Sequence, residues 1–371
     1  MNKRIIHRSA LLIAGLPLLA MLTACDKVDV IDQRQQPTTV GDLVPLQLAS
    51  GISVSVTRAY DSTWDNGDQI GVFATTAGTT TITTSGATQT NGNIPYTIAT
   101  GGETWVSNAN SYLTFSAVDK NIYLPADGSN IDVYAYYPYH ADVSATTPRS
   151  ITIPDAQNSA EQVANLKACD VLTAKRLSTA QSPVNIDNTT AQLLFSHVLS
   201  KVLIKIKLGT GVNLSDIQNK VNSVIITGQP TSGTFAPLTQ TLTISTEAAT
   251  VKTITPKLIV SGDPEYESYD ATGTIHAYRA LLMPNNDTTN PASASTVVTG
   301  EGANPHLITF SVGDNNVPYH YPITYALRSG YQTTFTITFG ASGIRVDAAI
   351  QPWTADGATG VISPEDPELE P

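Results

Sequence analysis

The sequence has few cysteines, few charged residues and no long apolar run. Only two of its 371 residues are cysteines, Cys25 and Cys169, which excludes a fold held together by several disulfides. The longest apolar stretch, residues 10–24, contains Pro17. It is shorter than the roughly 20 residues that a membrane-spanning helix needs. We therefore expect no membrane-spanning helix.

The motifs of the common enzyme classes are also missing. The sequence contains no G-x-S-x-G turn, no H-E-x-x-H zinc motif and no glycine-rich phosphate loop with a lysine. Its six histidines are scattered without metal-ligand spacing. We therefore expect no enzyme activity, no cofactor and no metal. An exported hydrolase is the least favoured function, because paired acids and bases do not occur in recognisable settings, although a carboxylate pair can lie far apart in sequence.

The first residues are typical of an export signal. Three basic residues precede the apolar stretch, as in a secretory signal. The stretch ends in "LTAC", which resembles the bacterial lipobox, where the signal is cut before the cysteine and the thiol carries lipid. We expect residues 1–24 to be a lipoprotein signal peptide, Cys25 to be lipidated, and residues 25–41 to be a polar tether. The alternative is an ordinary signal with a chance cysteine.

The charge of the remaining chain is acidic. Removing residues 1–24 takes away three basic residues and no acid, so 20 minus 3, or 17, Lys and Arg remain against 31 Asp and Glu. This balance, 17 minus 31 or −14, repels a phosphate backbone. Nucleic acid is therefore not an expected partner. The abundance of Thr, Ser, Gly, Asn and Pro favours turns and strands over helices.

Alternating apolar runs separated by turn residues recur along the chain and predict an all-β fold of sandwiches with Greek-key-like connections. The clearest run is "HVLSKVLIKIKL" at 197–208. Its alternation predicts one buried face, with Val202, Ile204 and Ile206, and one face in water, with Lys201, Lys205 and Lys207.

Helices are scarce. The clearest candidate, "SAEQVANLK" at 159–167, begins with Ser159 and Gln162 at the spacing of a capping box. Two residues are candidates for a functional role. One lies just after this helix and the other at the start of the run at 197–208. Cys169 is a candidate reactive thiol, but no base is evident beside it, so a buried core position is favoured. His197 is a candidate site residue, but a structural hydrogen bond at a strand end is favoured.

The stretch "DSTWDNGDQIG" places several carboxylates around a turn. The ligand spacing of a calcium loop is not met, because alternating ligands do not precede Gly67. Asn66-Gly67 is a strong turn signal, and we expect Trp64 to pack under the resulting hairpin. A turn is therefore favoured over a metal site.

The tyrosines of "VYAYYPYH" are the best candidates for contact with a carbohydrate. Exposed aromatic rings stack on sugars, and Tyr137 and Tyr139 are the residues placed for this. The favoured alternative is structural: Tyr134 and Tyr136 point into the core while Tyr137 and Tyr139 cover an edge.

Several segments together resemble the Bacteroidales fimbrillin-like lipoproteins, also called type V pilins. The segments are "TWDNGDQIGVF", "IDVYAYYPY", "DVLTAK", "LLFSHVLSKVLIKIKL" and "AAIQPW", in the order of that family. The resemblance implies two tandem β-sandwich domains of transthyretin-like topology. We expect them at 42–210 and 211–371, with the run at 197–208 closing the first and an acidic, proline-rich tail ending the second.

The resemblance also implies how the protein assembles. In that family the N-terminal strand fills a groove, a protease cuts after an arginine, and an extended segment of another subunit replaces the strand. "GISVSVTRAYD" places an alternating strand before Arg58, so the processing role is assigned to Arg58, with Arg34 as runner-up. Ile52, Val54 and Val56 are then the inward residues of the exchanged strand. The alternative is that Arg58 ends a permanent first strand.

The implied partners are other fimbrial subunits, and the implied location is the outer membrane, where a lipid anchor holds the surface-exposed protein or its fimbria. The tail after Trp353 departs from the pattern of a stalk subunit, because its acidic, proline-rich residues resist sheet formation. A tip or accessory subunit is therefore favoured over the main stalk. The alternative function is a monomeric surface lipoprotein that binds a glycan or another host ligand.

Overall fold

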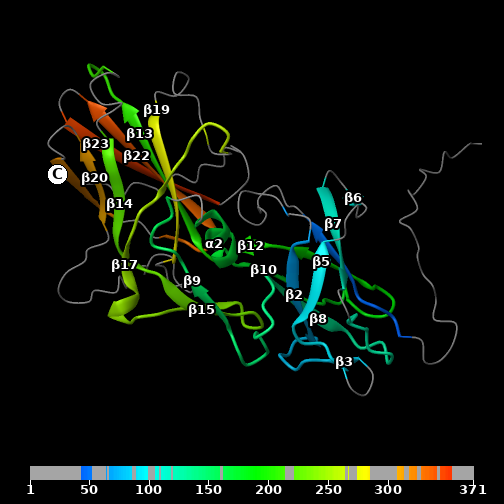
Figure 1. Ribbon diagram of the computed structural model, residues 1–371. Coiled ribbons are helices and arrows are strands. Elements are labelled where there is room, and N and C mark those ends of the chain that lie inside the picture. Colours follow the sequence, from blue (N-terminus) through cyan, green and yellow to red (C-terminus); the bar gives the residue numbers. More distant parts are fainter. Residues whose placement is uncertain are drawn as a thin grey trace, which may run out of the picture. The chain divides into compact units, whose positions relative to one another are not determined.

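The computed structural model describes a chain that is mostly β (Figure 1). The residues described are 43–51, 64, 67–85, 89–98, 105–107, 110–117, 120–158, 162–213, 221–263, 266, 274–284, 307–312, 317–323, 327–340 and 343–352. Helix within these ranges is limited to α2, Gln162–Cys169, and one 3₁₀ turn, Ala248–Thr250. The all-β class is confirmed to that extent, as is a helix near 159–167. Within the same ranges no helix has the length and apolar character to cross a membrane.

The largest sheet is built from strands of the first half of the chain. Its order is β11-β1-β7-β5-β2-β8-β10-β12, with β6 paired to β7. The strands are β1 Gln47–Gly51, β2 Gln69–Thr76, β5 Ile94–Ile98, β6 Trp105–Ser107, β7 Asn110–Ala117, β8 Ile131–Tyr137, β10 Leu172–Arg176, β11 Thr190–Leu194 and β12 Ser196–His197. A small hairpin of β3, Thr84–Ser85, and β4, Gln89–Thr90, lies between β2 and β5 in sequence.

Side chains of this sheet enclose a first core. The core takes buried residues from six strands, among them Leu48, Ile70, Val72, Tyr96, Val133, Leu172 and Leu193. Alternation assigns the two faces of the central strands, because successive side chains in a strand point to opposite sides. On β2, Ile70 and Val72 join the first core, whereas Phe73 joins a different cluster. All but the two end residues of β2 are therefore buried, on both faces of the strand.

Two further sheets are built from the second half of the chain. One has the order β18-β19-β13-β22-β23 and the other β17-β14-β20-β21. The first comprises β13 Ser200–Leu208, β18 Lys257–Leu258, β19 Thr274–Leu282, β22 Tyr331–Gly340 and β23 Gly343–Pro352. The second comprises β14 Val221–Pro230, β17 Val251–Ile254, β20 Leu307–Val312 and β21 Val317–Pro322. Both sheets contribute to a second core that includes Val202, Ile204, Ile226, Phe310 and Phe335.

The strand β13 corrects part of the sequence-based expectation. Val202, Ile204 and Ile206 are buried, as predicted. The opposite face is not simply in water, because Lys201 is only 8% exposed and Lys205 and Lys207 are half-buried. Leu203 lies on that same face and packs with Ile259 and Ala277, which covers it.

The expectation that β13 closes the first domain is wrong. β13 pairs antiparallel with β19 and parallel with β22, and it packs in the second core. Figure 1 shows β13 among these strands of the second half. A two-domain division near residue 210 stays a prediction, and the pairing of β13 favours a boundary before Ser200 instead.

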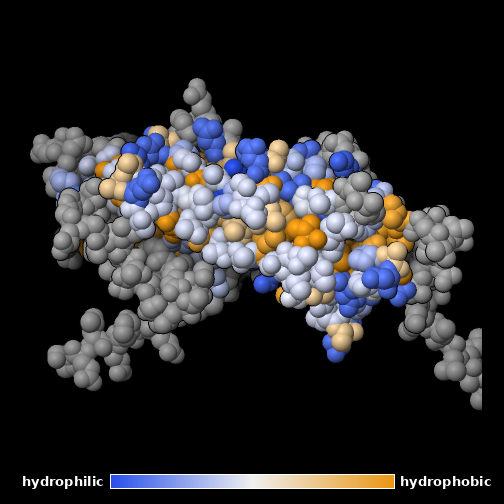
Figure 2. All heavy atoms as spheres, turned by 90° about the horizontal axis from the view of Figure 1, so that it is seen from below, coloured by the Kyte–Doolittle hydropathy of each residue, from blue (hydrophilic) through white to orange (hydrophobic). Residues whose placement is uncertain are grey.

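A third core joins residues from both halves of the chain. A three-stranded sheet has the order β16-β15-β9, from β9 Arg149–Thr152, β15 Ser232–Ala236 and β16 Thr241–Ile244. Beside it lies a cluster that contains Phe73, Tyr136, Ile151, Leu166, Leu199, Phe235, Leu281 and Met283. On the face drawn in Figure 2, hydrophobic residues form separate patches among hydrophilic ones.

Candidate functional site

The N-terminal strand lies between two strands rather than at the edge of its sheet. β1 pairs antiparallel with β7, with Leu48 opposite Phe115, and parallel with β11, with Leu48 opposite Ala191. Its backbone therefore has a partner strand on each side. Removal of β1 would leave β7 and β11 with one unpaired edge each, and unpaired strand edges readily accept another strand.

The same segment closes part of the first core. Leu46 and Leu48 are buried, and Val44 is half-buried against them. These three side chains alternate with the exposed residues Pro45 and Gln47 in "VPLQL", the period of a strand with one buried face. Loss of the segment would therefore expose apolar core as well as strand edges.

A short pairing holds the segment ahead of β1. The Leu46 N–H donates to the Ile122 carbonyl at 2.8 Å, and the Leu124 N–H donates to the Val44 carbonyl at 2.8 Å. Pro45 lies opposite Tyr123 between these two bonds. Proline is tolerated there because the position needs no N–H for the pairing. We call the pairing of residues 44–46 with residues 122–124 the clasp.

The predicted site residues fall only partly within the described residues. Cys25, Arg34, Arg58 and the strand of Ile52, Val54 and Val56 lie outside them. The described part of the N-terminal strand is β1, which ends at Gly51, directly before the predicted strand. The sequence interpretation missed Val44, Leu46 and Leu48, although their alternation was a usable signal.

The turn around Gly67 is structural within the part of the chain that the structure describes. Gly67 has a φ of 90°, which favours glycine. Trp64 packs edge-on against Tyr137 and Phe195 of the first core, with ring centroids 5.1 and 5.2 Å apart, and its place under a hairpin stays a prediction. Asp68 accepts a hydrogen bond from the Tyr137 hydroxyl at 3.1 Å and pairs with Lys167. No group of three potential metal ligands occurs among the described residues.

The tyrosine run is mainly a core element. Tyr134 and Tyr136 are buried in the third core, as the structural alternative predicted. Tyr137 is only 2% exposed and packs in the first core, so its assignment as a ligand contact is wrong. β8 is buried on both faces, which leaves no free face for a sugar. Tyr139 is half-buried, and its role as a ligand contact stays a prediction.

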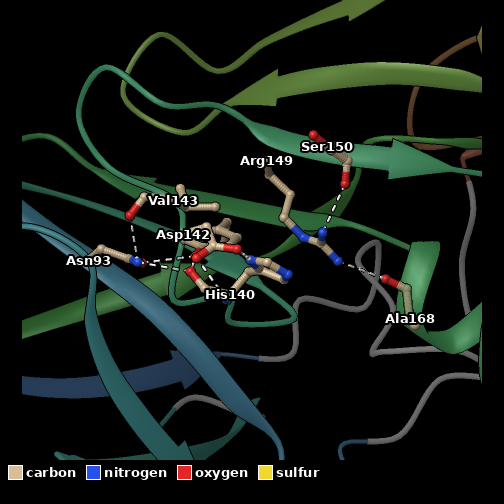
Figure 3. Close-up of polar contacts among 8 residues, drawn as sticks. Asn93, His140, Asp142, Val143, Arg149, Ser150 and Ala168 are labelled. Carbon is tan, nitrogen blue, oxygen red and sulfur yellow. Dashed lines mark hydrogen bonds and ion pairs between the residues drawn. The ribbon is translucent and has the colours of Figure 1, made fainter.

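A polar clamp holds the loop after β8. The Tyr136 hydroxyl donates to the Asn93 side-chain oxygen at 2.8 Å, and Asn93 donates to the carbonyls of His140 and Val143 at 2.9 and 2.7 Å. Figure 3 shows the bonds of Asn93 to His140 and Val143 beside Arg149, which donates to the carbonyls of Ser150 and Ala168. These side chains bond mainly to backbone carbonyls, so the cluster fixes a loop rather than forming a reactive site.

Two further candidate residues have structural roles. Cys169 is buried in the third core, and burial raises the pKa of its thiol well above the usual range. Its predicted core position is confirmed, because such a thiol is almost entirely protonated and unreactive. His197 Nδ1 lies 2.9 Å from Asp170 Oδ1, and both side chains are buried. This pair joins β12 to the end of α2, which confirms the predicted structural hydrogen bond.

Comparison with known proteins identifies the family. The fimbrillin-like family model matches residues 57–353. The chain belongs to the fimbrillin-like family. The match begins after β1, so the clasp and the described part of the N-terminal strand lie ahead of the matched region.

Individual relatives of this fimbrillin-like chain cover nearly its whole length. It is 28% identical over 361 residues to Fim1C of Bacteroides uniformis, a candidate fimbrium subunit, covering 94% of this chain and 96% of that one. Its fold resembles that of a candidate cell adhesion protein from Bacteroides ovatus, with a TM-score of 0.57 at 20% identity, covering 85% and 100% of the two chains. A similar protein from Bacteroides uniformis gives a TM-score of 0.53 at 24% identity, covering 84% and 99%. Membership of this family makes the chain a structural protein rather than an enzyme.

Proposed function

We propose that the protein is a subunit of a cell-surface fimbria, assembled with other subunits by exchange of its N-terminal strand. The observation that carries this proposal is the position of β1 between β7 and β11. A strand in that position can be replaced by an extended segment of another subunit that makes the same backbone hydrogen bonds. The relation to Fim1C, a candidate fimbrium subunit, supports the same conclusion.

The energetics favour replacement over simple loss of the strand. Burying a leucine side chain contributes roughly 1.5–3 kcal/mol, and the segment buries Leu46 and Leu48. An empty groove would lose the free energy of burying these leucines and the backbone pairing on both sides of β1. The strand is therefore retained until a cut and a competing segment are both present.

We assign the cut to Arg58, with Arg34 as the runner-up, and the lipid anchor to Cys25. Arg58 follows the alternating residues Ile52, Val54 and Val56, which continue the chain beyond β1. The anchor would tether the subunit to the outer membrane before assembly. We propose two tandem sandwiches of transthyretin-like topology, and the core common to two sheets of the second half supports this for that half.

Within the fimbria, we propose a tip or accessory position. The tail from Pro364 to Pro371 is acidic and rich in proline. Such a segment resists pairing in a sheet, which makes it unsuited to donating a long strand.

The proposal is tested by removing the processing arginine. Arg58→Ala should keep the fold and surface display but should be absent from purified fimbriae, because its strand cannot be released. Arg34→Ala is the matched control and should be incorporated as the wild type is. The measurement is mass spectrometry of fimbriae and of the membrane fraction from cells that express each variant. Fimbriae that contain uncut Arg58→Ala protein would refute assembly by strand exchange at this site.

A further inference from the structure

A buried tyrosine connects the first core to the clasp. Tyr96 lies on β5 and is 1% exposed. Its hydroxyl accepts a hydrogen bond from the Ile122 N–H at 3.0 Å. The carbonyl of the same residue, Ile122, accepts the Leu46 N–H of the N-terminal segment. The two backbone groups of Ile122 thus tie the core tyrosine to the strand that is to be exchanged.

We propose that Tyr96 is a positioning residue that holds residues 122–124 against residues 44–46 and so sets the rate at which the N-terminal strand leaves. This inference rests on the proposed strand exchange and identifies a residue that controls its rate. Residues 122–124 follow β7, which ends at Ala117, so they are not a continuation of the β1–β7 pairing. Their position depends on contacts of their own, and the Tyr96 bond is one of these.

The order of events gives the clasp its importance. A cut after Arg58 lies on the carboxyl side of β1, whereas the clasp lies on the amino side. A competing segment that enters from the cut end first displaces residues 51 to 47 from β7 and β11. Among the described contacts, the clasp is then the last to hold the outgoing strand. Its strength determines whether a partly displaced strand leaves or pairs again.

The chemistry of the hydroxyl suits this role. Burial raises the pKa of Tyr96 to about 12, so the group stays neutral and keeps its hydrogen bond at physiological pH. Ile122 is fully buried, so replacing the tyrosine by phenylalanine removes an acceptor that water cannot readily replace. The ring itself, which fills the first core, is kept.

The structure offers a matched control in Tyr136. Tyr136 is equally buried, and burial also raises its pKa to about 12. Its hydroxyl bonds to Asn93 and His140 and not to the N-terminal segment. Tyr136→Phe therefore removes a comparable buried hydroxyl without touching the clasp.

The experiment compares hydrogen exchange in the purified full-length wild type, Tyr96→Phe and Tyr136→Phe. We expect amides of residues 43–51 and 122–124 to exchange about tenfold faster in Tyr96→Phe, the effect of losing one buried hydrogen bond. Amides of residues 131–137 should be unchanged in that variant. Tyr136→Phe should leave residues 43–51 at the wild-type rate. Equal rates at residues 43–51 in both variants, or faster exchange throughout the chain in Tyr96→Phe, would overturn the proposal.

A second measurement tests displacement directly. Each protein is first cut after Arg58, a fluorescent synthetic peptide with the sequence of residues 43–58 is added, and its incorporation is followed. Incorporation into Tyr96→Phe should be about tenfold faster than into Tyr136→Phe, and equal rates would contradict the inference. If Tyr96→Phe does not fold, hydrogen exchange of single amides in the wild type is the test. The amides of Leu46, Ile122 and Leu124 should open together. Independent opening of these amides would contradict the clasp. None of these readouts uses fimbriae, so they are separate from the Arg58→Ala test.

Discussion

At the scale of single residues, Gly71 has no room for a side chain. A Cβ added there would lie 2.3 Å from Tyr136 Cε1 and 2.5 Å from Asn93 Oδ1. Both neighbours belong to the clamp on the loop after β8, which restricts how far they can move. Gly71 is therefore required by space, because the bond between Tyr136 and Asn93 passes where a side chain would be.

Gly71→Ala should destabilise the folded protein by about 1–3 kcal/mol, the usual cost of overpacking a core. The measurement is the free energy of unfolding from urea denaturation. Gly92→Ala is a suitable control, since the nearest side-chain atom to its added Cβ lies 3.6 Å away, an ordinary contact. Equal stability of the two variants would show that the clamp rearranges freely.

The buried tyrosines also predict how stability depends on pH. The pKa values of Tyr96 and Tyr136 are raised by burial from 10.0 to about 12. A folded-state pKa above the unfolded value favours the protonated folded protein. The stability that each raised pKa adds is fully present below pH 10 and is lost as pH rises towards 12. The unfolding free energy should therefore fall above pH 10, by up to about 1.4 kcal/mol per pH unit for each tyrosine.

The check is urea denaturation at pH 9, 10 and 11 for the wild type and for the double variant Tyr96→Phe, Tyr136→Phe. The variant should be less stable at pH 9 but should lose less stability between pH 10 and 11. An identical decline in both proteins would assign the alkaline transition to other groups.

At the scale of elements, the sequence predicts a strand well where its residue types favour strands and the structure buries them. β8 is rich in aromatic and β-branched residues, which favour strands, and its seven residues are all buried. β13 was predicted from its alternation, but the environment of Lys201 and Leu203 was not. Leu203 packs with Ile259 and Ala277, which are distant in sequence, and no local pattern reveals which segment covers a sheet face.

The candidate site shows the same limit. Sequence alone indicated an N-terminal strand ahead of Arg58 but not its place in the sheet. β1 pairs with β11, where Gln47 lies opposite Thr190, and such distant pairing leaves no local signature. The clasp was equally hidden, because it depends on Tyr96, Ile122 and Leu46 meeting across the core. The alternation of Val44, Leu46 and Leu48 is visible in the sequence. The alternation at 52–56 is stronger, and the exchanged strand was therefore predicted there.

At the scale of the whole molecule, residues 149–157 connect the two halves of the chain. β9 pairs with β15, and the Ile153 N–H donates to the Thr231 carbonyl at 2.7 Å. Gln157 then bonds through its side chain to both backbone groups of Leu281, donating to the carbonyl at 2.8 Å and accepting from the N–H at 2.9 Å. These contacts border the third core, which takes side chains from both halves. The halves are therefore expected to unfold together.

Gln157→Ala tests this coupling. Gln157 is 1% exposed, so the substitution leaves both backbone groups of Leu281 without a buried partner and should cost about 2–4 kcal/mol. The measurement is pulsed hydrogen exchange during urea unfolding, followed in peptides that cover residues 131–137 and 202–208. The two peptides should lose protection at the same urea concentration in the wild type and in the exposed-site control Gln192→Ala. In Gln157→Ala the two losses should move to lower urea and separate, because the connection that makes unfolding cooperative is weakened. Separate losses already in the wild type would show that the halves are independent and that the third core does not couple them.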